Sequence, residues 1–271
     1  AQAPTVSCPT SVTVVNSAGL CTASVTLPLP YTEDNCGVAS VLNNYNNTGN
    51  ASGVYPVGTT TVVWTVTDLN GNTATCSHTV TVTDSEAPAL TCPANISLLA
   101  ASGSCDAVAT WTTPTPTDNC TASGSIVLSS THASGSTFAL GTTTVTYTAT
   151  DAAGNTTTCS FTVTVTDTSV PTFTAGCGAS FTGNTVNGVC YGDVTVVTPT
   201  VTDNCGVVSL LNSYTGASLA SGFYPVGTTV VVWTATDASG NTTTCSQTVT
   251  VTDAQAPTVS CPTSVTVVNS A

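Results

Sequence analysis

Cysteine is the residue of this sequence with the most distinctive chemistry. The sequence contains thirteen cysteines, at positions 8, 21, 36, 76, 92, 105, 120, 159, 177, 190, 205, 245 and 261. None forms the C-x-x-C spacing that is typical of metal binding or thiol redox chemistry in reducing compartments. The spacing is typical of a disulfide framework instead, which predicts an extracellular or cell-surface location, where the surroundings are oxidising.

The carboxylates are the second group with potential chemistry. Nine of the thirteen acidic residues occupy three recurring positions. These are the D-N before a cysteine (Asp34, Asp118, Asp203), the T-D-x-x-G-N motif (Asp68, Asp151, Asp237) and the T-V-T-D motif (Asp84, Asp167, Asp253). Because the sequence has no Lys or Arg, its formal net charge is −13. Any charged partner should therefore be a cation, and metal ions are the obvious candidates.

The same composition excludes several classes of function. Nucleic acids and anionic lipid surfaces are bound largely through Lys and Arg, so neither is an expected partner. No apolar run approaches the roughly eighteen residues of a membrane-spanning helix. His78 and His132 occupy non-equivalent places, and the sequence has no G-x-S-x-G motif. We interpret both histidines as exposed polar side chains, and we predict that the chain is not an enzyme and requires no cofactor.

The cysteine spacing repeats three times. Within each group of four cysteines the gaps are twelve, fourteen, and thirty-eight or thirty-nine residues, and the first cysteines of successive groups are 84 or 85 residues apart. A fixed period of this kind indicates tandem modules. We predict module 1 at residues 1–84, module 2 at 85–167 and module 3 at 168–253, with the first strand of a further repeat at 254–271.

Each module contains strand patterns and no helical pattern. "TTTVVWTVTD" (59–68) and "TTVVVWTATD" (228–237) alternate Thr with apolar residues, the period of a half-buried strand. A G-N turn and a second alternating strand follow, as in "TCSHTVTVTD" (75–84), which predicts a hairpin. The sequence therefore predicts an all-β fold of tandem immunoglobulin-like antiparallel β-sandwiches, stapled by disulfides.

This fold would bring the recurring aspartates together. The D-N and T-D-x-x-G-N loops lie at the pole where the chain enters a sandwich, and the T-V-T-D end of the preceding module arrives there. The predicted metal ligands are Asp84, Asp118 and Asp151 at one junction and Asp167, Asp203 and Asp237 at the next. Calcium binds six to eight such oxygens, so we predict calcium that bridges successive modules. A simpler alternative is that these residues only form Asx turns.

Module 2 resembles the hyalin-repeat (HYR) family of extracellular modules. The residues that carry the resemblance are "CPANISLL", "WTTP", "DN", "FALGTTTVTYTATDAAGN" and "TCSFTVTVTD". All three modules match, although Cys177-Gly178 replaces Cys-Pro, and Trp64 and Trp233 replace Tyr147 on a core-facing strand. The resemblance implies a structural or adhesive role without catalysis.

The resemblance also implies a disulfide pairing, because many HYR modules keep only the first and fourth cysteines. It implies bonds Cys8–Cys76, Cys92–Cys159 and Cys177–Cys245. The remaining pairs would then be Cys21–Cys36, Cys105–Cys120 and Cys190–Cys205. Spacing alone does not choose among the three connectivities that four cysteines allow. Cys261, the counterpart of Cys8, has no partner of this kind within the sequence.

We predict a structural subunit of a repetitive extracellular fibre or cell-surface stalk. The alternative is an adhesin array that binds a carbohydrate or protein ligand through the loops after the third cysteine, which vary most between modules. Six N-x-S/T sequons are candidate glycosylation sites: Asn46, Asn50, Asn95, Asn119, Asn155 and Asn241.

Residues 1–18 and 254–271 are identical. One explanation is that residues 254–271 donate a strand to another molecule. We favour the other, that the polypeptide continues with a further copy of the same repeat. In both cases the expected partner is a copy of the chain itself.

Overall fold

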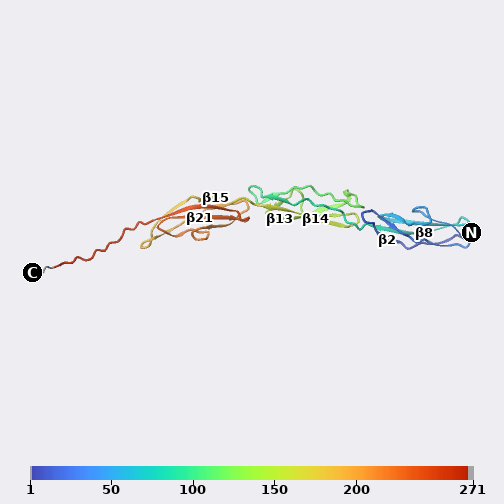
Figure 1. Ribbon diagram of the computed structural model, residues 1–271, viewed down its shortest axis with the longest axis horizontal. Coiled ribbons are helices and arrows are strands. Elements are labelled where there is room, and N and C mark those ends of the chain that lie inside the picture. Colours follow the sequence, from blue (N-terminus) through green and yellow to red (C-terminus); the bar gives the residue numbers. More distant parts are fainter. Residues whose placement is uncertain (1, 268–271) are drawn as a thin grey trace. The chain divides into compact units, whose positions relative to one another are not determined.

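The computed structural model describes residues 2–267 of the chain (Figure 1). The chain divides into two compact units. The first contains Ala1–Ile96, Ala109–Ser136 and Thr143–Val163, and the second contains Ser97–Val108, Thr137–Thr142 and Thr164–Ala271. Within the described residues, no helix has the length and hydropathy needed to cross a membrane.

Module 1 consists of eight strands. They are β1 (Thr5–Ser7), β2 (Val12–Val15), β3 (Thr22–Val25), β4 (Tyr31–Glu33), β5 (Val38–Asn43), β6 (Gly53–Pro56), β7 (Gly58–Asp68) and β8 (Thr73–Thr83). The main sheet has the order β2-β8-β7-β5, while β3 pairs with β6 and β1 with β4. The long hairpin β7–β8 is the one that the alternating Thr pattern predicts.

Module 2 repeats this arrangement. Its elements are β9 (Ile96–Leu99), β10 (Asp106–Val108), the 3₁₀ turn η1 (Ser123–Ser125), β11 (Val127–Ser130), β12 (Thr137–Ala139), β13 (Gly141–Thr150) and β14 (Thr156–Thr166). The sheet orders are β11-β13-β14-β9 and β10-β12. A single bridge between Ala89 and Thr117 takes the place of the β1–β4 pair.

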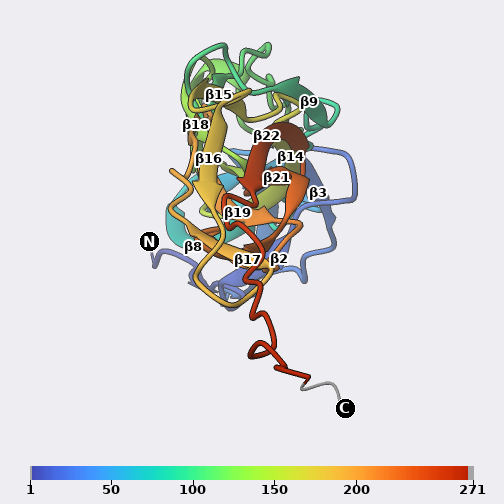
Figure 2. The same ribbon diagram turned by 90° about the vertical axis from the view of Figure 1, so that its left-hand side faces the viewer.

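Module 3 has the same eight strands as module 1. They are β15 (Thr172–Ala175), β16 (Ser180–Asn184), β17 (Tyr191–Val194), β18 (Thr200–Thr202), β19 (Val207–Asn212), β20 (Gly222–Pro225), β21 (Gly227–Asp237) and β22 (Thr242–Thr252). Figure 2 shows the main sheet, with the order β16-β22-β21-β19. Residues 254–267 form no strand, and residues 268–271 lie outside the described part of the chain, so the strand expected at 254–271 stays a prediction.

The cores explain why these sequences form sandwiches. From Val62 to Asp68 every second residue of β7 is buried, and Val62, Trp64 and Val66 are fully inaccessible, while Thr65 and Thr67 lie on the opposite, less buried face. Val80 and Val82 of β8 pack into one cluster with Val62 and Trp64. Because strand side chains alternate between the two faces of a sheet, Thr supplies a β-branched residue on the outer face. The predicted all-β sandwich class is confirmed.

One pairing differs from the antiparallel prediction. β2 runs parallel to β8, with Val12 opposite Val80 and Val15 opposite Thr83. β16 pairs with β22 in the same parallel way. β2 therefore ends beside the end of β8, and β16 ends beside the end of β22. This direction is set by the crossover of the chain, and periodicity within a strand carries no information about it.

The interpretation of His78 as an exposed residue is wrong. His78 lies on β8, is only 5% exposed, and faces the core. The alternation of β8 places it on the same face as Val80 and Val82. His132 is half-buried in the loop after β11, where its Nδ1 lies 3.2 Å from the Thr131 hydroxyl.

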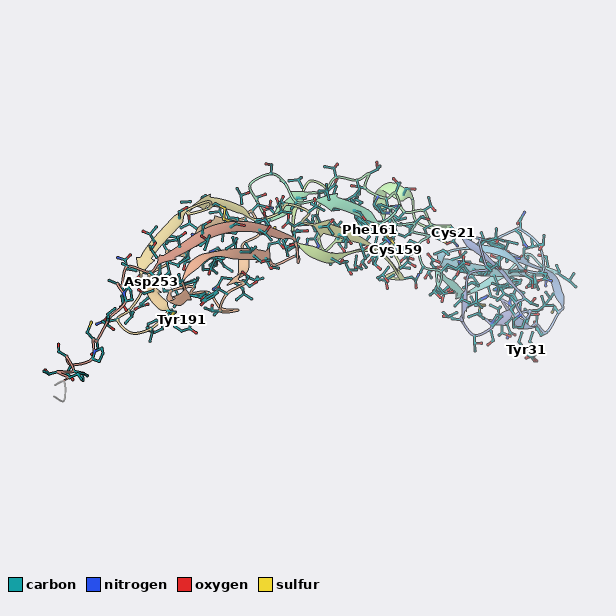
Figure 3. All side chains as sticks on the ribbon, turned by 60° about the vertical axis from the view of Figure 1, so that its left-hand side comes forward. Cys21, Tyr31, Cys159, Phe161, Tyr191 and Asp253 are labelled. Carbon is teal, nitrogen blue, oxygen red and sulfur yellow. A yellow bond between two sulfur atoms is a disulfide. The ribbon has the colours of Figure 1, made fainter. Side chains whose placement is uncertain are left out.

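The first and fourth cysteines of each module are bonded, as the family resemblance implies. The bonds are Cys8–Cys76, Cys92–Cys159 and Cys177–Cys245. Each closes a loop of nearly seventy residues, which is worth about 4 kcal/mol in the chain-entropy model. Figure 3 labels Cys159 on β14, two residues before the buried Phe161.

Candidate functional site at the module junctions

The T-D-x-x-G-N turn holds its aspartate in the same way in all three modules. In module 1, Oδ1 of Asp68 accepts hydrogen bonds from the amides of Asn70 and Asn72 at 2.8 Å, and Oδ2 accepts one from the Asn72 side chain at 2.6 Å. Gly71 supplies the φ of 86° that the turn requires. The side-chain bond from Asn72 is the main reason why the pKa of Asp68 lies below its usual value.

The corresponding aspartates of the other modules are also ionised in the fold. Burial raises the pKa of the Asp237 carboxyl, but the hydrogen bonds from Asn241 and from the neighbouring backbone amides outweigh it and hold the pKa below its usual value. The pKa of Asp151 is lowered in the same way, with Asn155 as the main donor. At neutral pH these carboxylates therefore carry their negative charge.

The D-N aspartates use only one carboxylate oxygen for their loop. Oδ1 of Asp203 accepts the amide of Cys205 at 2.8 Å, and Oδ1 of Asp34 accepts that of Cys36 at the same distance. Oδ2 of each is buried and has no hydrogen-bond partner. The Asx-turn explanation thus accounts for one oxygen and leaves the other unexplained.

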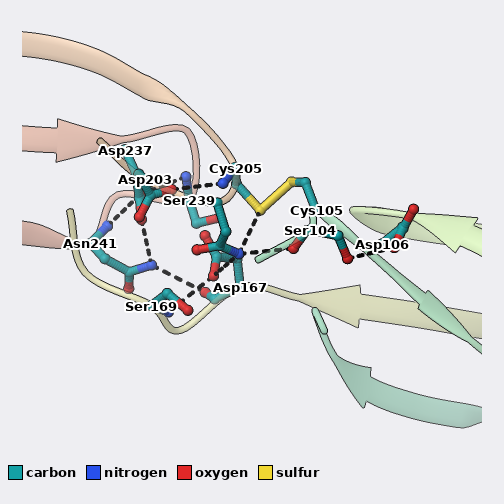
Figure 4. The surroundings of a disulfide bond; sticks show 11 residues. Ser104, Cys105, Asp106, Asp167, Ser169, Asp203, Cys205, Asp237, Ser239 and Asn241 are labelled. Carbon is teal, nitrogen blue, oxygen red and sulfur yellow. Dashed lines mark hydrogen bonds between the residues drawn. A yellow bond between two sulfur atoms is a disulfide. The ribbon is translucent and has the colours of Figure 1, made fainter. Parts of the chain in front are cut away.

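The second junction brings three predicted ligands together. Asp167, Asp203 and Asp237 each direct a carboxylate oxygen into one site, and these oxygens lie within 4.8 Å of one another. Figure 4 shows this cluster. Asp167 is 6% exposed, and its Oδ2 has no hydrogen-bond partner. The amide of Asn241 bridges the Asp237 carboxylate and the backbone carbonyl of Asp167.

The first junction is similar but not identical. Asp84, Asp118 and the sulfur of Cys120 lie within 4.8 Å of one another. Asp84 Oδ2 and Asp118 Oδ1 are buried without partners. The structure does not bring the carboxylate of Asp151 into this group. Asp151 is connected to it indirectly, because Asn155 bonds both its carboxylate and the carbonyl of Asp84.

These clusters are electrostatically unbalanced. Buried carboxylates usually require a paired cation or a full set of hydrogen bonds. The sequence has no Lys or Arg to supply the charge. The orphaned oxygens therefore point to a cation, and an all-oxygen group such as that of Asp167, Asp203 and Asp237 suits a hard divalent ion. Metal binding itself stays a prediction.

The second junction also contains a disulfide that the sequence did not predict. Cys105 is bonded to Cys205, beside the aspartate cluster (Figure 4). Asn204 stabilises this contact through a 3.0 Å bond to the carbonyl of Ser104. The expected bonds Cys105–Cys120 and Cys190–Cys205 are therefore wrong.

Strand register explains this correction. Cys21 follows β2, whose Val15 lies opposite Thr83 at the end of β8. Cys36 precedes β5, whose Val38 lies opposite Asp68, next to the beginning of β8. The second and third cysteines of a module therefore lie at opposite ends of its long hairpin and cannot bond to each other. The expected Cys21–Cys36 bond is wrong for the same reason.

The first junction places Cys21 and Cys120 in the arrangement of Cys105 and Cys205. Cys21 and Cys120 are both free thiols, and Cys21 lies close enough to Cys120 to contribute to the shift of its pKa. Burial, the contact with Cys21, and the carboxylates of Asp84 and Asp118 raise the pKa of Cys120 to about 12. The amide of Asn119 reaches the carbonyl of Leu20 at 3.1 Å, as Asn204 reaches Ser104.

Three candidate glycosylation sites belong to these junctions. The side-chain amides of Asn119, Asn155 and Asn241 all donate the hydrogen bonds described above. Asn46 and Asn50 lie exposed in the loop after β5. Asn95 is exposed as well, although its Oδ1 accepts the amide of Thr162.

Comparison with known proteins agrees with this architecture. The model of the HYR domain matches residues 1–82, 83–165 and 166–251. Hyalin of Strongylocentrotus purpuratus is 35% identical over 261 residues, covering 92% of this chain and 20% of hyalin. Hyalin of Lytechinus variegatus is 34% identical over 228 residues, covering 82% of this chain and 41% of that protein. The chain thus spans only a part of the length of these relatives.

Two solved structures are also similar over most of the chain. Mouse Cadherin-23 EC22-24 is 15% identical, with a TM-score of 0.36 and coverage of 93% of this chain and 99% of that one. Sidekick-1 immunoglobulin domains 1-5 are 13% identical, with the same TM-score and coverage of 93% and 59%.

Proposed function

This chain belongs to the HYR domain family, and on that premise we propose that it is a structural segment of an extracellular fibre or cell-surface stalk built from HYR domains in series. The observation that carries the proposal is the Cys105–Cys205 bond, which joins one module covalently to the next. A stapled junction contributes to the integrity of a series of modules and adds nothing to the fold of either module alone. The disulfides also favour an oxidising, extracellular location.

The role that we propose is non-enzymatic. The chemistry that recurs in the three modules lies in cysteines and turn aspartates, which hold the chain together. The competing role is adhesion, in which the loops after the third cysteine bind a carbohydrate or a protein. A repeated, buried junction favours the structural role, because a binding array would need no covalent bond between its modules.

We further propose that calcium binds at the junctions. At the second junction Asp167, Asp203 and Asp237 would hold the ion, and the unpartnered Oδ2 atoms of Asp167 and Asp203 are the specific support. At the first junction Asp84 and Asp118 would do so. A bound divalent ion would offset the repulsion between the carboxylates and stiffen the junction.

Electron microscopy of the native material tests the structural role. We expect filaments with a constant axial repeat. Saturable binding of a glycan or protein by the full chain, together with the absence of filaments, would instead support the adhesin.

Calorimetry tests the calcium site. Calcium should raise the melting temperature of the full chain, and a chelator should lower it. At a calcium concentration of about 100 times the dissociation constant the stabilisation is about 2.7 kcal/mol. Asp203→Asn should reduce this effect, whereas Asp193→Asn, on the exposed side of β17, should leave it unchanged. If neither calcium nor the chelator changes the melting temperature, the proposal is wrong.

A further inference from the structure

The two junctions follow one pairing rule for cysteine. The second cysteine of a module meets the third cysteine of the following module, as in the Cys105–Cys205 bond and the Cys21–Cys120 contact. Two cysteines of the chain are left without such a contact in the described residues. Cys190 is the second cysteine of module 3, Cys36 is the third cysteine of module 1, and both side chains are exposed.

The end of module 3 has the conformation of a junction. At the first junction, the amide of Glu86 bonds Asp84 Oδ1, and the Glu86 carboxylate accepts the amide of Gly19 at 2.8 Å. After module 3, the amide of Gln255 bonds Asp253 Oδ1 at 3.0 Å. The Gln255 side chain then accepts the amide of Gly188 at 3.2 Å.

The backbone next to this segment also repeats. The amide of Asn16 bonds the carbonyl of Thr83, and the amide of Thr185 bonds that of Thr252. Figure 3 labels Asp253 where the chain leaves module 3. The segment after module 3 is therefore already placed as the linker to a further module.

The opposite pole of module 1 matches the receiving side of a junction. A groove of about 260 Å³ at the first junction is lined by Glu86, Ala87, Ala89, Thr117, Asp118 and Asn119. A groove of about 290 Å³ on module 1 is lined by the six residues in the corresponding positions, Gln2, Ala3, Thr5, Glu33, Asp34 and Asn35. Oδ2 of Asp34 is buried there without a partner, like Oδ2 of Asp203.

We propose that the end of module 3 docks on the free pole of module 1 in the next copy of this repeat, and that a Cys190–Cys36 disulfide closes this junction. Asp253 then joins Asp34 and Asp68 of that copy, as Asp167 joins Asp203 and Asp237. The identity of residues 1–18 and 254–271 supports this choice of partner, because the linker after module 3 has the sequence that leads into module 1. The inference rests on the serial arrangement proposed above.

The same rule assigns a disulfide to Cys21 and Cys120. Each bond forms when two thiols lose two protons and two electrons. A disulfide of a thiol oxidoreductase accepts both and is reduced to two thiols, so the exchange balances. With these bonds, every second and third cysteine of the repeat has a partner in a neighbouring module.

Disulfide mapping of the native protein tests the inference. The protein is extracted without reductant, alkylated and digested with pepsin, because the sequence has no tryptic site. We expect peptides that join Cys36 to Cys190 and Cys21 to Cys120, and both should vanish on reduction. Peptides that join Cys21 to Cys36, or alkylated free thiols at Cys36 and Cys190, would overturn the proposal.

The source of the next copy is read from the mass after reduction. Reduced chains near 26.8 kDa would identify the partner as a second molecule, and a much larger polypeptide would identify it as the continuation of the same chain. If the material forms filaments but its disulfides join cysteines within one module, this inference is wrong and the structural role stands. If the expected peptides are found in material that forms no filaments, the disulfide pairing stands and the structural role is wrong.

A matched pair of variants checks the specificity of the contact in recombinant chains that assemble through disulfides, all carrying Cys261→Ser. Cys36→Ser should abolish the disulfide-linked oligomers that reduction dissolves. The double variant Cys21→Ser with Cys120→Ser should retain them, since it removes a contact within one chain. Oligomers that persist in Cys36→Ser would show unspecific crosslinking and contradict the proposal.

Discussion

Modules 1 and 3 share one architecture but differ in whether the polar groups of their cores have hydrogen-bond partners. In module 3, Gln247 is fully buried and accepts a hydrogen bond from Trp233 Nε1 at 2.8 Å. Its amide donates to the carbonyls of Gly176 and Val197. In module 1 the same place on the last strand holds His78. Neither ring nitrogen of His78 nor Nε1 of Trp64 has a hydrogen-bond partner among the described residues.

The sandwich therefore tolerates a polar residue at this position but does not require one. Module 2 has Phe161 there, packed edge-on against Trp111 at 5.1 Å between ring centroids. Trp111 Nε1 donates instead to the Tyr147 hydroxyl at 2.7 Å. Three side chains of different chemistry thus occupy one core position. They differ in whether the neighbouring buried polar groups find hydrogen-bond partners, and each group without a partner lowers the stability of the module.

The largest expected effect is that leucine at the same core position destabilises module 3 but does not destabilise module 1. Gln247→Leu leaves Trp233 Nε1 and two backbone carbonyls unpaired, and should destabilise module 3 by about 3 kcal/mol or more. His78→Leu removes two unpaired nitrogens and should leave module 1 unchanged or more stable. Hydrogen exchange of β21–β22 and of β7–β8 in the full chain, followed by peptic mass spectrometry, reads each module separately. Equal losses in both modules would contradict the comparison.

A second substitution should make module 1 resemble module 3. His78→Gln offers Trp64 Nε1 the acceptor that Gln247 gives Trp233, and should stabilise module 1 by about 1 kcal/mol. Slower exchange in β7–β8 with no change in β21–β22 is the expected result. Faster exchange there would mean that the carbonyls bonded by Gln247 have no counterparts in module 1.

A lower pH should destabilise module 1 but should not lower the stability of module 3 at Gln247, which does not titrate. Burial lowers the pKa of His78 below its usual value of 6.5. The unfolded chain therefore binds a proton that the folded chain excludes, and stability falls as the pH drops below about 6.5. Exchange of β7–β8, corrected for the intrinsic rate, should accelerate between pH 7.5 and 5. In His78→Gln this acceleration should disappear, and its persistence would assign it to another group.

The smallest expected effect comes from two stacked tyrosine pairs, which should contribute equally to the stability of modules 1 and 3. Tyr45 stacks on Tyr55 with ring centroids 4.1 Å apart, and Tyr214 stacks on Tyr224 at 4.2 Å. Tyr45→Phe and Tyr214→Phe keep the stacking and remove one exposed hydroxyl bond each. Both should cost about 1 kcal/mol or less, and by equal amounts. Unequal costs in the exchange experiment would reveal a further difference between the two cores.

Much of the fold was predictable because it depends on local patterns. The alternation of Thr with Val and Trp identified the β7–β8 and β21–β22 hairpins, and the cysteine period identified the modules. The convergence of Asp167, Asp203 and Asp237 followed from loops of known position in a sandwich. The burial of His78 follows from its alternation with Val80 and Val82, whereas the polarity of the imidazole predicts exposure.

Other features depend on information that spacing does not contain. The bond between Cys105 and Cys205 follows from the ends of the hairpin at which the two residues lie, and sequence separation favours the nearer Cys120. The parallel pairing of β2 with β8 is likewise a property of chain crossover. Asn155 holds Asp151 by the same two hydrogen bonds with which Asn241 holds Asp237, so the turn does not explain why Asp151 stays outside the first cluster, where the sulfur of Cys120 takes the third place.

The offset pairing of the cysteines has a mechanical consequence. If the bonds at Cys21 and Cys120 and at Cys105 and Cys205 carry a pulling force, the shortest covalent path through module 2 runs only from Cys105 to Cys120. That path is about 15 residues and extends to no more than about 50 Å, whereas a whole unravelled module of about 84 residues would reach nearly 300 Å. Most of each sandwich therefore carries none of the pulling force. A backbone cut in a loop outside this path would leave the covalent connection through the module intact.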